Sequence, residues 1–156
     1  MSSPYRPSAR MDRYIPLIRE FAAREGLFHG AVARKLGLHA TDEHVLRLLG
    51  AQAMTAGALA EYTGLTGAAM TAVVDRLEAS GYVTRERDTD DRRRITIHAV
   101  PAKLRKLNQL YTGQGAAMSS LLSKYKEAEF AAIIDYLTQT TRILTDQTAK
   151  LSDTKD

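Results

Sequence analysis

The chain has 156 residues, a net charge of +4 and no cysteine. The length indicates one compact domain with appended elements, large enough to bury its own core. The lack of cysteine excludes disulfides, thiolate zinc sites and cysteine redox sensing. The sequence contains neither an apolar run long enough to span a membrane nor the apolar core of a signal peptide, so we expect a cytoplasmic protein without a membrane partner.

A long amphipathic helix is expected first, after a loose N-terminal arm. It begins near Asp12 or Pro16 and continues to Gly37, with Pro16 in its first turn or at a kink. Two glycines, Gly26 and Gly30, weaken the helix near its middle and predict a bend there.

Three shorter helices are expected next, over residues 41–52, 55–63 and 66–80. Thr41 and Thr66 are predicted N-caps, because a threonine hydroxyl before an apolar helical pattern accepts bonds from the first free N–H groups. The last two helices are joined by a short turn, as in a helix-turn-helix. The inner face of the helix over 66–80 is expected to consist of Leu65, Ala69, Met70, Val73, Val74 and Leu77.

A β-hairpin is expected after Gly81, because YVTRE (82–86) and RITIHAV (94–100) alternate between apolar and polar residues on either side of a polar loop tip near 88–92. Two long helices close the chain. The first starts at Pro101, whose fixed φ suits a first helical turn, and the second runs from about residue 127 to 151.

The positive charge is concentrated in and after the hairpin. Residues 84–106 contain eight basic and four acidic residues, so their excess equals the net charge of the whole chain. Such a run is either a solvated turn or a surface for a polyanionic partner. Its place directly after a helix-turn-helix favours the second interpretation: the helix over 66–80 would enter the major groove of DNA and the hairpin tip the adjacent minor groove.

The segment LAEYTGLTGAAMTAVVDRLEASGYVTRERDTDDRRRITI (59–97) resembles the MarR family of transcriptional regulators, and the resemblance extends over nearly the whole chain. In that family the recognition helix ends in a DRLE-type run, followed by G-[LY]-[VI]-x-R and a DxxDRR wing. The matching residues are Asp75, Arg76, Leu77, Glu78, Gly81, Val83, Arg85, Asp88, Asp91, Arg92 and Arg93. One departure follows the wing, where AVP (99–101) replaces the usual Leu-Thr pair.

The resemblance implies a mainly α fold with a small β-hairpin wing. A winged helix-turn-helix domain (41–100) would lie between an N-terminal arm and dimerisation helix (1–40) and C-terminal dimerisation helices with a tail (101–156). It also implies a homodimer on a pseudo-palindromic double-stranded DNA site, with Arg93 in the minor groove and Asp91 orienting it. Many family members bind a small aromatic or phenolic effector near the dimerisation helices. The residues here that either line such a site or are ordinary core side chains are Arg13, Tyr14, Phe21, Phe28, His29 and Tyr111.

The expected DNA contacts come from the helix over 66–80 and from the wing. They are Thr66, Gly67, Ala68, Thr71, Arg76, Asp91, Arg92, Arg93 and Arg94. The outer face of this helix, which includes Gly67, Ala68 and Thr71, has no Arg, Asn or Gln in its early turns for bidentate base contacts. Specificity is therefore expected to depend on the wing and on DNA shape.

We expect a sequence-specific, ligand-responsive repressor rather than an enzyme, with no cofactor. No nucleophile elbow, phosphate-binding Gly-rich loop or dinucleotide fingerprint is present, and the four histidines lack metal-ligand spacing. The alternative is a winged-helix protein-interaction module whose basic wing is only solvated.

Overall fold

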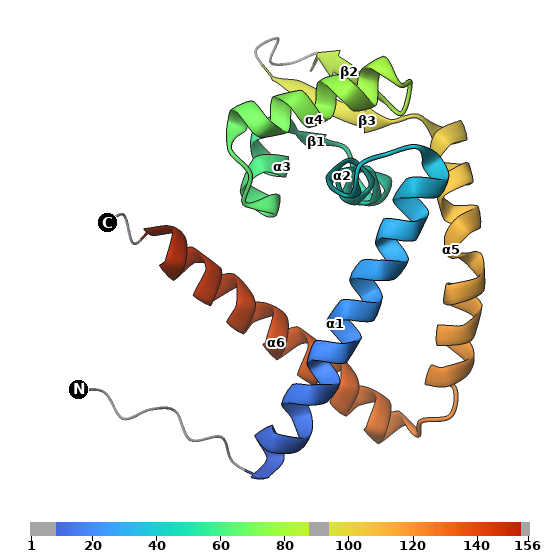
Figure 1. Ribbon diagram of the computed structural model, residues 1–156, viewed down its shortest axis with the longest axis vertical. Helices are drawn as coiled ribbons and strands as arrows, with labels where there is room; N and C mark the ends of the chain where they lie inside the picture. Colours follow the sequence, from blue (N-terminus) through green and yellow to red (C-terminus); the bar gives the residue numbers. More distant parts are fainter. Residues whose placement is uncertain (1–8, 88–93, 154–156) are drawn as a thin grey trace. The chain divides into compact units, whose positions relative to one another are not determined.

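The computed structural model describes residues 9–87 and 94–153. The chain divides into two compact units, Met1–Leu110 (the N-terminal unit) and Tyr111–Asp156 (the C-terminal unit), with the boundary inside helix α5. In chain order the elements are α1 (Ala9–Leu36), α2 (Ala40–Ala51), β1 (Met54–Thr55), α3 (Ala56–Thr63), α4 (Gly67–Ala79), β2 (Val83–Arg87), β3 (Ile95–Ala99), α5 (Pro101–Leu122) and α6 (Glu127–Asp153). The mainly helical fold with a small sheet confirms the expected fold class (Figure 1).

Helix α1 starts earlier than expected. It begins at Ala9, so Pro16 lies inside the helix and not in its first turn. The helix continues through both of its glycines and ends at Leu36, followed by Gly37 with a φ of 70°. The next amide, that of Leu38, donates to the carbonyl oxygen of Ala33 at 2.9 Å, which closes the end of the helix.

The caps of the three following helices are partly as expected. The prediction for Thr41 was wrong, because α2 starts at Ala40 with His39 in the N-cap position and no side-chain cap bond. Thr66 does cap α4, accepting from the Ala69 amide at 3.2 Å. Thr55, where the short helix was expected to start, caps α3 in the same way.

The sheet has a third strand that the sequence pattern did not reveal. Strand β1 pairs antiparallel with β3, Met54 opposite Ile97, and β3 pairs antiparallel with β2, giving the order β1-β3-β2. A strand of two residues is too short to show a period-two pattern. Figure 1 shows α2, α3 and α4 gathered beside this sheet.

The core of the N-terminal unit lies between α2, α3, α4 and the sheet. Of the inner-face residues expected for α4, Met70, Val73, Val74 and Leu77 are buried, and Leu65 and Ala69 are half-buried. The other fully buried large apolar side chains are Leu46, Leu59, Ile97, Leu107, Val45 and Val83. This packing holds the inner face of α4 and leaves its outer face to solvent.

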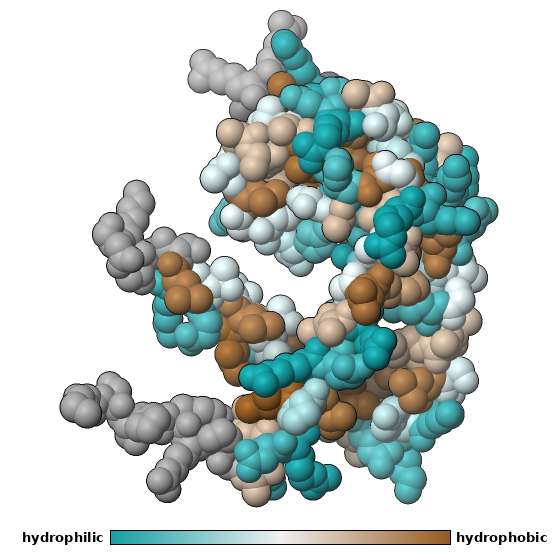
Figure 2. Space-filling view, viewed as in Figure 1, coloured by the Kyte–Doolittle hydropathy of each residue, from teal (hydrophilic) through white to brown (hydrophobic). Residues whose placement is uncertain are grey.

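The C-terminal unit differs from the N-terminal unit in the burial of its side chains. None of its described residues up to Leu151 is buried, and α6 exposes large apolar side chains. These are Ile134, Tyr136, Leu137, Ile143, Leu144 and Leu151. Figure 2 shows brown, apolar surface along α6. Within the described part of the chain, no helix is long and apolar enough to cross a membrane.

Candidate nucleic-acid interface

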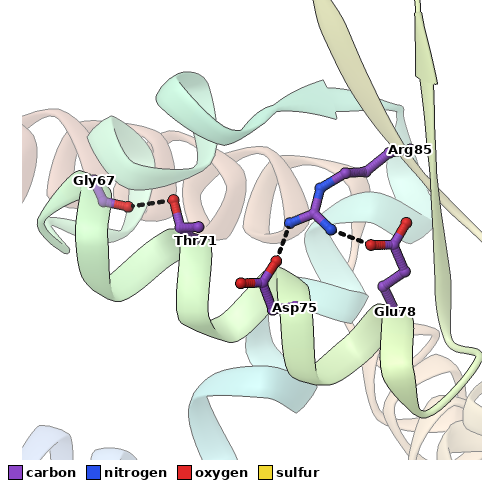
Figure 3. Close-up of polar contacts among 5 residues, drawn as sticks. All are labelled: Gly67, Thr71, Asp75, Glu78 and Arg85. Atoms are coloured by element: carbon purple, nitrogen blue, oxygen red, sulfur yellow. Dashed lines mark hydrogen bonds and ion pairs between the residues drawn. The ribbon is translucent and has the colours of Figure 1, made fainter.

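The outer face of α4 is small and uncharged over its first two turns. Gly67, Ala68, Thr71 and Ala72 are all exposed there, on the side opposite the buried apolar residues. The Thr71 hydroxyl donates to the carbonyl oxygen of Gly67 at 2.9 Å, so its proton is used within the helix (Figure 3). A partner can therefore approach the backbone of this half of the helix closely.

The second half of α4 is tied to strand β2 by one arginine. The Nη2 of Arg85 donates to Oδ1 of Asp75 at 2.5 Å, and its Nη1 donates to Oε2 of Glu78 (Figure 3). The hydrogen bond to Asp75, followed by the charge of Glu78, raises the pKa of Arg85. The planar guanidinium reaches both carboxylates at once, which a lysine could not do, and it neutralises the acidic charge on this part of α4.

Helix α4 is also tied to α2. Arg76 donates to both carboxylate oxygens of Asp42, from Nη2 at 2.6 Å and from Nε at 3.2 Å. Asp42 is buried, and the hydrogen bond to it raises the pKa of Arg76. The predicted DNA contact of Arg76 stays a prediction, but the structure gives its guanidinium a definite role in positioning α4. No local pattern could have revealed this pair, because its members lie 34 positions apart.

The wing starts and ends on the paired strands β2 and β3. Arg94, just before β3, is exposed to solvent. The predicted contacts Asp91, Arg92 and Arg93 lie outside the described residues. The register of the two strands, with Arg87 opposite Ile95, places both ends of this loop next to each other.

The structure brings only some of the candidate effector residues together. Arg13 and Tyr14 line a shallow, open pocket on α1 with Arg10 and Leu17. Phe21 is more than half exposed and lies outside this lining. The three other candidates, Phe28, His29 and Tyr111, also lie outside this lining. His29 packs edge-on against Phe28, and Tyr111 belongs to the C-terminal unit.

A polar cluster on α2 was missed at the sequence level. Arg47 forms an ion pair with the buried Glu43 at 2.9 Å, and its Nη2 lies 3.0 Å from Nδ1 of His44. Burial, then the positive charge of Arg47, lowers the pKa of His44. The i, i+4 spacing of Glu43 and Arg47 and the i, i+3 spacing of His44 and Arg47 could have predicted these contacts from the sequence. Among the residues that the structure describes, no group of three or more His, Asp or Glu side chains could hold a metal ion.

A three-helix core with a short hairpin beside its last helix defines a winged helix-turn-helix. The MarR family model matches residues 36–94. The chain is 36% identical over 138 residues, 88% of its length and 90% of the relative's, to the uncharacterized HTH-type transcriptional regulator YcgE of Bacillus subtilis. The chain belongs to the MarR family of transcriptional regulators; it is a DNA-binding regulator and not an enzyme.

Solved structures share this fold. A MepR F27L mutant of S. aureus bound to an oligodeoxyribonucleotide matches with a TM-score of 0.56 and 23% identity, covering 84% of this chain and 97% of that one. Bordetella bronchiseptica BpsR, in a study of the regulation of its DNA binding by 6-hydroxynicotinic acid, matches with a TM-score of 0.58 and 21% identity, covering 89% and 98%.

Proposed function

We propose that two copies of this chain bind a pseudo-palindromic DNA site, each with α4 in a major groove and its wing in the neighbouring minor groove. The observation that carries this proposal is the outer face of α4. Its first two turns are exposed and uncharged, while Arg76 and Arg85 hold the helix to α2 and β2. Two-fold symmetry would then place the half-site centres one helical turn, ~34 Å, apart.

The exposed apolar surface supports the homodimer. In α6, Leu137 and Leu144 are more than half exposed and lie one heptad apart, so they share one face of the helix. In α1, Leu17, Phe21 and Leu27 are also more than half exposed. Apolar patches of this kind are uncommon on monomers and mark interaction sites. A second copy of the chain is the partner that would bury them, as is typical of the family.

The wing would supply the minor-groove contact. Arg93 is the residue proposed to enter the groove, with Asp91 directing its side chain and Arg92 and Arg94 contacting the phosphate backbone. An arginine suits this position because narrow minor grooves concentrate negative potential. Thr66, the N-cap of α4, is proposed to contact phosphate, as residues at helix N-termini do in protein–DNA complexes.

The regulator is proposed to act as a cytoplasmic, ligand-responsive repressor. BpsR, whose DNA binding is regulated by a small aromatic acid, supports an effector of this class. Arg13 and Tyr14, which share a pocket lining, are the first candidates to hold it, with Phe21, His29 and Tyr111 as further candidates. An effector that prefers one spacing of the two recognition helices would shift the dimer away from the spacing that fits DNA.

Salt-dependent binding to duplex DNA tests the proposal. The plot of log affinity against log salt should be linear, and Arg93→Ala should reduce its slope by about 1 for each phosphate that the arginine neutralises. It should also weaken binding about tenfold or more, since a charged hydrogen bond contributes about 1.5–3 kcal/mol. Arg142→Ala on α6 removes the same charge and should change neither quantity. If no duplex binding is detected at low salt, the result favours the alternative of a protein-interaction module. If Arg93→Ala and Arg142→Ala have the same affinity and salt slope, the role of the wing is refuted.

A further inference from the structure

We infer that the first two turns of α4 read A·T base pairs, through thymine methyl groups and the adenine amine, and do not read guanine. This inference rests on the proposed placement of α4 in the major groove and adds the base chemistry that it selects. It follows from which side-chain donors of the helix are already hydrogen-bonded within the protein.

Guanine presents two acceptors, N7 and O6, in the major groove, so a side chain that reads it must donate. Within Gly67–Ala79 only Thr71 and Arg76 carry side-chain donors. Arg76 donates to both oxygens of the buried Asp42, and the Thr71 hydroxyl donates to the carbonyl oxygen of Gly67. The one donor of Thr71 is therefore already used inside the protein. Arg76 keeps N–H groups beyond the two that bind Asp42, but it lies in the third turn of α4. A guanine facing the first two turns would have to break the Thr71 bond.

The groups that remain on this face accept hydrogen bonds or make apolar contacts. With its proton directed at Gly67, the Thr71 oxygen offers lone pairs, which match the N6 amine of adenine. The methyl groups of Thr71, Ala68 and Ala72 match the C5 methyl of thymine. An A·T pair supplies both partners side by side in the major groove, whereas a G·C pair supplies an amine but no methyl.

The acidic residues of α4 do not change this preference for A·T over G·C pairs. Asp75 and Glu78 are both bound by Arg85, which fixes their direction toward β2 (Figure 3). Thr66 precedes the helix, and its oxygen accepts from the Ala69 amide. Its proton stays available where helix N-termini contact phosphate. The reading positions are thus the first two turns, centred on Thr71.

The test starts with selection of bound sequences from a random DNA pool by the full chain. The selected duplex is then altered one base at a time, with uracil for thymine, which removes the methyl group, and with purine for adenine, which removes the N6 amine. We expect A·T pairs at the positions under the first two turns of α4. Uracil there should weaken binding about fourfold per site, the equivalent of about 0.8 kcal/mol for one buried methyl group.

Two substitutions at Thr71 separate the contributions of its hydroxyl and its methyl group. Thr71→Val keeps a methyl group and loses the acceptor, so it should be insensitive to purine while remaining sensitive to uracil. Thr71→Ser keeps the acceptor and loses the methyl group, so it should stay sensitive to purine and become insensitive to uracil only at the thymine that faces position 71. Thr138→Val on α6 is the matched control, since its hydroxyl also donates one turn back, to Ile134, at 2.8 Å. It should bind every duplex as the unaltered chain does.

The outcomes distinguish this inference from the proposed function. Selected sites with guanine under the first two turns of α4, or binding that no uracil substitution weakens, would overturn the inference and leave the DNA-bound regulator intact. A failure to bind any duplex at low salt would overturn both.

Discussion

The N-terminal and C-terminal units differ in where their apolar side chains lie. The N-terminal unit buries Leu46, Leu59, Met70 and Leu77 completely, whereas the C-terminal unit buries none of its described side chains and exposes Leu137 and Leu144. The first unit thus holds its recognition helix by its own packing. The second has an apolar face that is stable in water only when something covers it. In the proposed dimer, the N-terminal unit would contact DNA and the C-terminal unit would set the distance between the two recognition helices.

The largest expected effect is on the core of the N-terminal unit. Leu46→Ala removes a fully buried side chain and should lower the free energy of unfolding by about 2–5 kcal/mol, through reduced burial and the remaining cavity. Chemical unfolding at several protein concentrations measures it. The decrease should not depend on concentration, because the packing lies within one chain. A decrease below that of a surface substitution would show that this core is not the source of stability.

The second effect belongs to the C-terminal unit. Leu144→Asp should favour the monomer, because each leucine loses about 1.5–3 kcal/mol of burial in the dimer and a charge enters an apolar interface. Sedimentation over a range of concentrations measures the dissociation. Gln139→Asp adds the same charge to another face of α6 and should leave the dimer intact. Equal behaviour of the two variants would mean that the Leu144 face is not the interface.

The third effect concerns the link between β2 and α4. Arg85→Met removes both ion pairs of Arg85 while keeping much of its apolar stem. Because Asp75 and Glu78 are largely exposed, stability should fall by no more than about 1 kcal/mol. DNA affinity should fall more than stability does. In the proposed complex Asp75 and Glu78 lie beside the DNA, and without Arg85 their negative charges would repel its phosphates. Fluorescence anisotropy with labelled duplex measures the affinity, and Arg85→Lys should restore it only in part. If Arg85→Met binds DNA as tightly as the unaltered chain, the ion pairs between β2 and α4 do not contribute to DNA binding.

The smallest effect is a pH dependence centred on His44. Its pKa is lowered mainly by burial and then by Arg47, with Glu43 raising it and His29 lowering it. As the pH falls below the ordinary histidine value near 6.5, the unfolded chain binds a proton that the folded chain does not, so stability decreases until the pH reaches the lowered pKa. Thermal unfolding between neutral and mildly acidic pH should show a smaller decrease in stability for His44→Gln, and an unchanged decrease would place the titration elsewhere.

Local chemistry was enough to predict most elements. Thr66 caps α4, Gly81 ends its C-terminal turn with a φ of 69°, and Pro101 begins α5, all as expected from residue type and spacing. Such features depend on neighbours a few positions away, which a sequence shows directly. One local prediction failed: Thr41 had the right chemistry for a cap, but α2 starts at Ala40, with His39 in the N-cap position.

Residue order alone was sufficient to predict the class of the protein, the residues on each face of α4 and the concentration of positive charge around the wing. Which polar groups of that helix remain available depended on the folded domain. The ion pair of Arg76 with Asp42, 34 positions away, could not be predicted from the place of Arg76 on its helix. Strand β1 likewise depends on its pairing with β3. Hydrogen bonds and ion pairs join groups by distance in space, and that distance is set by the packing of the whole domain.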